Sequence, residues 1–225
     1  MSSGEIKTII FDLDGTLIDT EPAASAAITQ CFQGWGIEVE PQDAAFITGK
    51  TWATAFEFLF KKYKIPVTAD KASKQMMSCY RAALKEELIE VKGSVEAVKN
   101  LAQHYPLGLV SGSHRSEILF ALDKLGITKS FQVILGCEDY FRSKPAPDGY
   151  LRALALMEAK PQATVVFEDS EAGIDSAIAA GIWVVAINST NHFDQDTGKA
   201  HASVHDLQGV NSEWIKAASK KFFLA

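Results

Sequence analysis

Short apolar runs alternate with helical patterns along the chain after residue 91, and this alternation limits the fold more than any other feature. Each run is continuously apolar, which is typical of strands in a sheet that helices cover on both faces. The predicted strands span residues 7–11, 107–111, 133–136, 164–167 and 183–187. We therefore predict an α/β fold with a Rossmann-like, mostly parallel sheet and right-handed crossovers between its strands.

Residues 20–90 interrupt this alternation. Apolar residues recur there at helical spacing, and no convincing strand is found between residues 22 and 88. The helical patterns cover residues 22–32, 52–63 and 69–88. We therefore predict an all-helical domain of residues 20–90, inserted into an α/β core domain of residues 1–19 and 91–225.

Composition narrows the class of partner. The formal net charge of −6 disfavours a broad nucleic-acid surface but allows a local basic pocket for a small anion. No apolar run is long enough to cross a bilayer, so we expect no membrane contact and a cytoplasmic location.

Cys31, Cys79 and Cys137 are far apart in the sequence. We interpret them as small core residues in a reducing compartment, not as a disulfide framework or a zinc site.

Two carboxylates, Asp12 and Asp14, directly follow the first predicted strand, with Gly15 and Thr16 just beyond them. Carboxylates this close repel each other unless a cation or a shared proton compensates. A hard divalent ion with oxygen ligands is the natural compensation.

Three later segments also carry polar residues at strand ends or in adjoining loops. They are Val110-Ser111-Gly112-Ser113, Ser143-Lys144-Pro145-Ala146-Pro147-Asp148 and Phe167-Glu168-Asp169-Ser170. In a parallel sheet, these loops and the Asp12 loop converge on one edge. Acids, a lysine and small hydroxyl and backbone donors would then meet there, a combination that suits a phosphate held beside a divalent cation.

With these four motifs in this order, the sequence resembles the haloacid dehalogenase-like hydrolase superfamily, whose members are mostly phosphatases. A single DxDG is often only a turn, whereas the ordered set is far more specific. The matching positions are Asp12 to Thr16 (DxDGT), Ser111, Lys144 in SKPAPD, and the pair Glu168 and Asp169. The insert of residues 20–90 lies where this family has its helical cap, and the phosphatase and β-phosphoglucomutase groups look most similar.

The resemblance implies a two-step phosphoryl transfer with Mg²⁺ as the cofactor. Asp12 would attack phosphorus and form an aspartyl phosphate. Asp14 would protonate the leaving oxygen and then activate the hydrolytic water. The implied metal ligands are the Asp12 carboxylate, the Asp14 backbone carbonyl and Asp169, with Glu168 as a further ligand or in the outer shell.

The resemblance also implies which residues bind the phosphoryl group of the substrate. Ser111, the amide of Gly112 and Lys144 would hold the phosphoryl oxygens, and Thr16 would orient the loop. The Lys144 charge would reduce the repulsion between an anionic nucleophile and an anionic substrate.

Four further residues are candidates for contact with the rest of the substrate. They are Lys50 and Trp52 in a predicted cap loop and His114 and Arg115 after the second motif. Each pair also fits an ordinary helix start, and the sequence favours neither interpretation.

Other members of the superfamily differ from this chain at specific positions. Dehalogenases and phosphonate-cleaving relatives do not need the second aspartate, so Asp14 argues against both. β-Phosphoglucomutases carry a histidine where this chain has Ala24 and a cap-loop arginine where Gly49-Lys50-Thr51 is followed by Trp52. A phosphatase acting on a small metabolite, such as a sugar phosphate or phosphoglycolate, is therefore favoured over the mutase.

A non-catalytic phosphate-binding module is a further alternative, although such a module usually lacks a nucleophile or a metal ligand. The identity of the substrate and the oligomeric state, monomer or weak homo-oligomer, stay open.

Overall fold

A computed structural model describes most of the chain. The described residues are 5–43, 52–192 and 195–222, with the backbone alone for residues 52–54 and 221–222. The chain divides into two compact units, of which the first joins Met1–Asp19 to Glu90–Ala225 and the second is Thr20–Ile89. We call the second unit the insert. That the first unit is the catalytic core and that the insert acts as its cap stay predictions.

The main sheet of the first unit has six strands among the described residues, and its neighbouring strands pair in parallel. The strands, in spatial order, are β5 (Val133–Leu135), β4 (Leu107–Val110), β1 (Thr8–Phe11), β6 (Thr164–Glu168), β7 (Trp183–Ile187) and β8 (Ala202–Val204). Ile10 of β1 pairs with both Gly108 and Val166. Because β1 lies between β4 and β6, the loops that follow these three strands meet at one edge of the sheet.

Helices connect these strands. They are α5 (Ser94–Leu101), α6 (Arg115–Lys124), α7 (Asp148–Leu156), α8 (Glu171–Ala179) and α9 (Ser212–Phe222), with the short 3₁₀ helices η1 (Thr128–Ser130), η2 (Cys137–Asp139) and η3 (Pro161–Ala163). A separate two-stranded sheet consists of β2 (Ile18–Asp19) and β3 (Ile89–Glu90). Among the helices that the structure describes, none is long and apolar enough to span a membrane.

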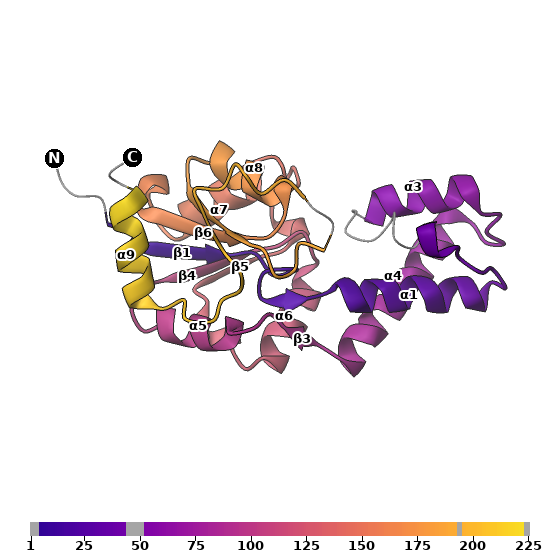
Figure 1. The fold of residues 1–225 in the computed structure, drawn as a ribbon. Helices are drawn as coiled ribbons and strands as arrows, with labels where there is room; N and C mark the ends of the chain where they lie inside the picture. The colour runs from indigo at the N-terminus through magenta and orange to yellow at the C-terminus, as the bar shows by residue number, and fades with distance from the viewer. Residues whose placement is uncertain (1–4, 44–51, 193–194, 223–225) are drawn as a thin grey trace. The chain divides into compact units, whose positions relative to one another are not determined.

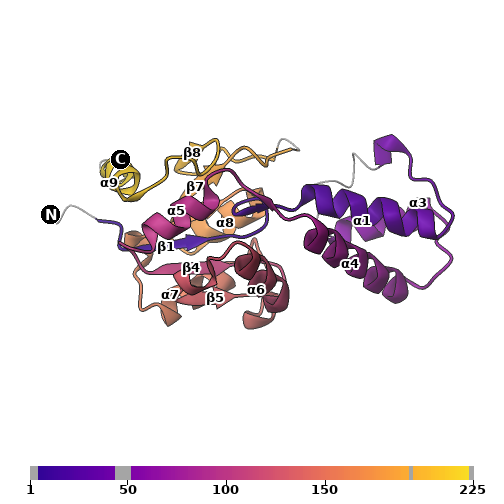
Figure 2. The same ribbon diagram turned by 90° about the horizontal axis from the view of Figure 1, so that it is seen from below.

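Both faces of the main sheet are covered, and Figures 1 and 2 show α5 and α7 on opposite sides of β1 and β4. On one face, Tyr150 of α7 packs in a core with Ile10. On the other, Phe11 stacks on Phe167 with ring centroids 5.0 Å apart, and Trp214 of α9 packs against Phe167. Successive strand residues point to opposite faces, so strands covered on both sides must be continuously apolar.

The predicted fold class is confirmed: an α/β fold with a parallel sheet and an inserted helical unit. Strand β8 differs from expectation, because no strand is predicted there. It has only three residues, pairs with β7 alone in the sheet, and includes the exposed Ser203. A short edge strand with a polar residue lacks the apolar run that identifies its neighbours.

The insert has its own apolar core. Its described residues include the helices α1 (Glu21–Gly34), α3 (Trp52–Lys62) and α4 (Ala69–Glu86). Phe32 of α1, Leu59 of α3 and Met76 of α4 are each 1% exposed and belong to one cluster. Figure 1 shows α1 and α4 side by side. The apolar residues that recur at helical spacing in the sequence therefore form the contacts between these helices.

The cysteines depart from the expected small core residues. Cys31 is buried, but Cys79 and Cys137 are partly exposed, and all three are free thiols. The Sγ atoms of Cys31 and Cys79 lie 3.0 Å apart and bring α1 into contact with α4. Helix packing thus places two cysteines side by side that are separated by 48 positions in the chain.

Candidate active site

Asp12 lies at the carboxyl end of β1. All four residues of β1 are buried, and the Asp12 N–H donates to the carbonyl oxygen of Phe167 at 3.0 Å. The Asp12 side chain is only 7% exposed. Burial raises the pKa of this carboxyl well above its ordinary value against the opposing charge of Lys144, and Glu168 and Asp14 raise it further.

Lys144 is the cationic centre of the site. Its Nζ lies 2.5 Å from both Asp12 Oδ1 and Glu168 Oε1, and it donates to the Val110 carbonyl at 3.2 Å. Burial alone would lower the pKa of Lys144, but the charges of Asp12, Glu168 and Tyr150 hold it well above its usual value. The lysine therefore stays charged beside Asp12 and Glu168.

Glu168 holds Lys144 in place from the end of β6. It is completely buried, and its Oε1 accepts from the hydroxyl of Tyr150 at 2.9 Å as well as from Lys144. Its Oε2 accepts the backbone N–H groups of Asp169 and Ser170 and the Ser170 hydroxyl. A Cβ on Gly173 would lie 1.8 Å from Oε1, so only glycine leaves room for this carboxylate. Both oxygens are engaged within the protein, which fits a positioning role.

Asp14 faces the turn that follows β4. Its Oδ2 accepts hydrogen bonds from Ser113 Oγ at 2.7 Å and from Ser111 Oγ at 3.1 Å. Burial raises the pKa of Asp14, although these two hydroxyls act in the opposite direction. A Cβ on Gly112 would meet no heavy atom within 4 Å among the described residues, so this turn has open space beside it.

Asp169 lies in the loop after β6, on the side of the site that faces Gly15 and Thr16. Thr16 Oγ1 lies 3.5 Å from Asp169 Oδ1, at the limit of a hydrogen bond. Gly15 has a φ of +81°, and a Cβ there would lie 2.0 Å from Asp169 Oδ2, so the turn needs glycine for both reasons. Burial raises the pKa of Asp169 well above its ordinary value, and the charges of Glu168 and Asp12 raise it further.

The donor set suits a hard divalent cation. Asp12, Glu168 and Asp169 each offer a carboxylate oxygen, and these atoms lie within 4.8 Å of one another. With Asp14, four carboxylates gather around the ammonium group of Lys144, and three of them have raised pKa values. A cation with oxygen ligands would relieve this repulsion.

The structure brings together the eight residues that the four motifs single out. Of the other candidates, only the side chains of His114 and Arg115 are described, and their contact with the substrate stays a prediction. His114 contacts Cys137, and Arg115 donates to the Ile134 carbonyl and to Asp139. Lys50 lies outside the described residues, as does the side chain of Trp52, so the two cap contacts stay predictions.

The sequence motifs assign no role to four supporting residues. They are Ser113, Tyr140, Tyr150 and Gly173. Tyr140 donates to the Ser111 carbonyl at 2.8 Å, and the others contact Asp14 or Glu168 as described. Ser113 adjoins a motif, whereas Tyr150 and Gly173 lie inside helices whose side-chain directions depend on the tertiary fold.

Comparison with known proteins identifies the family. The haloacid dehalogenase-like hydrolase family matches residues 9–187, which include every residue of the acid and lysine cluster. The chain belongs to this family. The predicted resemblance is therefore confirmed.

Several relatives resemble this chain over most of its length. Hexitol phosphatase A of Escherichia coli (strain K12) is 31% identical over 185 residues, which cover 81% of this chain and 83% of that protein. Validoxylamine A 7′-phosphate phosphatase of Streptomyces hygroscopicus subsp. limoneus is 29% identical over 205 residues, covering 91% and 95%. The crystal structure of a putative beta-phosphoglucomutase from Thermotoga maritima superposes with a TM-score of 0.77 at 26% identity, covering 96% and 99%.

Proposed function

We propose that the protein is a Mg²⁺-dependent phosphatase that hydrolyses a small phosphorylated metabolite through an aspartyl phosphate on Asp12. The observation that carries this proposal is the Lys144 ammonium, 2.5 Å from the Asp12 carboxylate inside a buried cluster of acids. Family membership and the phosphatases among the relatives support the same class of reaction.

In the first step, an Asp12 oxygen attacks phosphorus while the bond from phosphorus to the ester oxygen breaks. The leaving oxygen takes a proton from Asp14 and departs as an alcohol. Burial helps here, because the raised pKa of Asp14 favours its protonated form. Lys144 offsets the negative charge of the nucleophile and of the incoming phosphoryl group.

In the second step, water replaces Asp12. Asp14, now a carboxylate, accepts a proton from the water as the water oxygen attacks phosphorus. The bond between phosphorus and the Asp12 oxygen breaks, inorganic phosphate leaves, and both aspartates return to their starting states. The turn of Ser111 and Gly112, with open space beside it, is placed to receive phosphoryl oxygens after Ser111 exchanges its bond to Asp14.

Asp12 and Asp169 would hold Mg²⁺ through their carboxylates, together with the Asp14 carbonyl. When bound, the ion would neutralise charge on the phosphoryl group and orient it for attack. Glu168, whose oxygens both accept hydrogen bonds, would act indirectly by fixing Lys144 and the Asp169 loop.

The relatives indicate the substrate class. Hexitol phosphatase A and validoxylamine A 7′-phosphate phosphatase are named for phosphate esters of polyhydroxylated molecules. We assign the present chain to phosphate monoesters of the same kind, such as phosphorylated sugars and sugar alcohols.

A direct test combines turnover with capture of the intermediate. We expect phosphate release from p-nitrophenyl phosphate and from members of a sugar-phosphate panel, with loss of activity after chelation and recovery with Mg²⁺. Brief reaction with a labelled substrate should leave a label on the protein that hydroxylamine removes, as for an acyl phosphate. Asp12→Asn should remain folded, carry no label and lose at least about 10⁴-fold in turnover. An active and labelled Asp12→Asn protein would show that another group is the nucleophile.

A phosphomutase is the second candidate, because the putative beta-phosphoglucomutase resembles this chain over almost its whole length. Conversion of β-glucose 1-phosphate to glucose 6-phosphate, without release of phosphate, would favour the mutase. Release of inorganic phosphate as the main product would exclude it. Inactivity on every ester with Mg²⁺ present would favour a binding module.

A further inference from the structure

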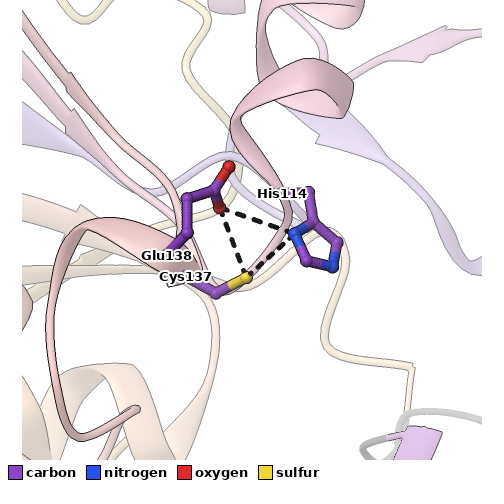
Figure 3. Close-up of side chains that lie close together, drawn as sticks. All are labelled: His114, Cys137 and Glu138. Atoms are coloured by element: carbon purple, nitrogen blue, oxygen red, sulfur yellow. Dashed lines mark hydrogen bonds and ion pairs between the residues drawn. The ribbon is translucent and has the colours of Figure 1, made fainter.

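A second cluster of potential metal ligands lies on the loops after β4 and β5, outside the acid and lysine cluster. It consists of His114, Cys137 and Glu138 (Figure 3). Cys137 Sγ is 3.4 Å from His114 Nδ1 and 3.5 Å from Glu138 Oε2, and His114 Nδ1 is 3.5 Å from the same oxygen. Figure 3 shows all three atoms turned toward a common point. Three different ligand types thus form a nearly equilateral triangle.

The backbone builds this triangle. Cys137 N–H donates to the Ser113 carbonyl at 3.0 Å, and Arg115 N–H donates to Glu138 Oε1 at 3.0 Å, leaving Oε2 toward the cluster. A Cβ on Gly136 would lie 2.6 Å from the Arg115 nitrogen and 2.9 Å from Glu138 Oε2. Glycine therefore permits the close approach of the two loops, and groups outside the triangle position the Cys137 backbone and the Glu138 carboxylate.

The spacing matches a tetrahedral metal site. Zn²⁺ binds sulfur at about 2.3 Å and nitrogen or oxygen at about 2.0–2.1 Å, which separates tetrahedral ligands by roughly 3.3–3.6 Å. We propose that His114, Cys137 and Glu138 bind one divalent transition-metal ion of the zinc class, with a fourth position open to solvent. The exposed fractions of the His114 and Glu138 side chains, 57% and 45%, give the ion a path from solution.

A catalytic thiol would need a different arrangement. In a thiol–imidazole–carboxylate relay, the thiol and the carboxylate contact opposite nitrogens of the imidazole. Here the Cys137 thiol and the Glu138 carboxylate both face Nδ1 of His114. A metal ion at the centre uses all three groups at once.

The two candidate metal sites differ in chemistry. Thiolate and imidazole select zinc-like ions, whereas the oxygen ligands of Asp12 and Asp169 suit Mg²⁺. Binding at the triangle would form a metal–sulfur bond and release the Cys137 thiol proton to solvent. This second site does not depend on the proposed phosphatase activity, because binding alone can test it.

Co²⁺ is a suitable probe, because a cobalt–thiolate bond gives a charge-transfer absorption that oxygen ligands do not give. We would titrate the reduced full-length protein with Co²⁺ in excess Mg²⁺, then displace the bound Co²⁺ with Zn²⁺. We expect one Co²⁺ per chain with a thiolate band that Zn²⁺ abolishes. Cys137→Ser should eliminate the band, and His114→Gln and Glu138→Gln should each weaken binding by about 10–100-fold.

Controls separate this site from the other thiols and acids. Cys79→Ser tests the Cys31–Cys79 pair, His205→Gln tests an exposed histidine elsewhere, and Asp169→Asn tests the acid cluster. All three should keep the band and the affinity of the unsubstituted protein, and circular dichroism would verify the fold of each variant. The proposal is overturned if no thiolate band forms, if Cys137→Ser retains it, or if it disappears in Cys79→Ser. Equal binding by the unsubstituted protein and by folded His114→Gln would also overturn it.

Discussion

Each of the two units contains a lysine that contacts two carboxylates and lies near a tyrosine ring. The Lys144 cluster consists of Lys144, Asp12, Glu168 and Tyr150, and the Lys62 cluster consists of Lys62, Glu40, Asp43 and Tyr63. The two clusters have almost the same composition, but the pKa values of their acids are shifted in opposite directions. Burial raises the pKa of Asp12, whereas hydrogen bonds from Lys62 lower the pKa values of Glu40 and Asp43.

The difference comes from the surroundings of each lysine. Lys62 is 37% exposed and stabilises both of its acids as anions, with help from Tyr63 at Asp43 and from Gln42 at Glu40. Lys144 is 13% exposed, and Asp14 and Asp169 add negative charge to its surroundings. The charges of the Lys62 cluster are therefore balanced within the cluster, whereas the Lys144 cluster has more carboxylates than its lysine can neutralise. Such an excess is typical of a site arranged for a cation or for proton transfer.

Removal of the two lysines should have very different consequences. Lys144→Met leaves buried carboxylates without their counter-charge, so we expect the free energy of unfolding to fall by about 3–5 kcal/mol in the absence of divalent cations. Phosphatase activity should also be lost. Lys62→Met should lower stability less, because Lys62 and Glu40 are 37% and 54% exposed and the buried Asp43 keeps its hydrogen bond from Tyr63. Urea unfolding of both variants at neutral pH measures this contrast, and equal losses would show that the two clusters are equivalent.

Two glycines extend the comparison to the backbone. Gly173→Ala would place a Cβ 1.8 Å from Glu168 Oε1, so we expect a loss of roughly 1–3 kcal/mol from overpacking. Turnover should fall as well, because Glu168 positions Lys144. In the insert, a Cβ on Gly34 meets nothing within 4 Å, and Gly34→Ala at the end of α1 should raise stability by up to about 1 kcal/mol. Thermal unfolding and phosphate release would be measured for both; a stable and fully active Gly173→Ala protein would refute the positioning role of Glu168.

The sequence predicts the charged members of the Lys144 cluster better than Tyr150 and Gly173, which support them. Asp12 and Glu168 lie at the carboxyl ends of strands, so a parallel sheet is enough to bring their loops together. Tyr150 and Gly173 reach Glu168 from helices, and only the packing of α7 and α8 against the sheet determines that contact. Local patterns therefore identify residues whose position depends on strand order alone, and they miss residues whose position depends on helix packing.

The clusters outside the four motifs follow the same rule. His114 and Cys137 are 23 positions apart, and their contact depends on the close approach of two loops at Gly136. Their spacing in the sequence gives no indication of a shared metal ligand set. The Lys62 cluster is equally hidden, because Asp43 and Lys62 are 19 positions apart.

Acid titration of the Lys62 cluster should give the smallest effect. Hydrogen bonds from Lys62 and Tyr63 hold the pKa of Asp43 below its ordinary value. A carboxyl with a lowered folded-state pKa contributes stability above its unfolded pKa, near 3.9, and loses it as the pH falls through the folded pKa. Asp43→Asn should therefore be slightly less stable than the unsubstituted protein near neutral pH, and the difference should shrink toward zero as the pH falls through this range.

Thermal unfolding at a series of pH values measures this difference for Asp43→Asn. Asp70→Asn is the matched control, because Asp70 pairs with Lys74 on the surface with its side chain 76% exposed. Its effect on stability should be smaller than that of Asp43→Asn near neutral pH, since an exposed ion pair is weak and screened. A stability difference for Asp43→Asn that grows as the pH falls would mean that the Asp43 carboxyl is destabilised by its surroundings. The Lys62 cluster would then resemble the Lys144 cluster, and the contrast between the two units would be lost.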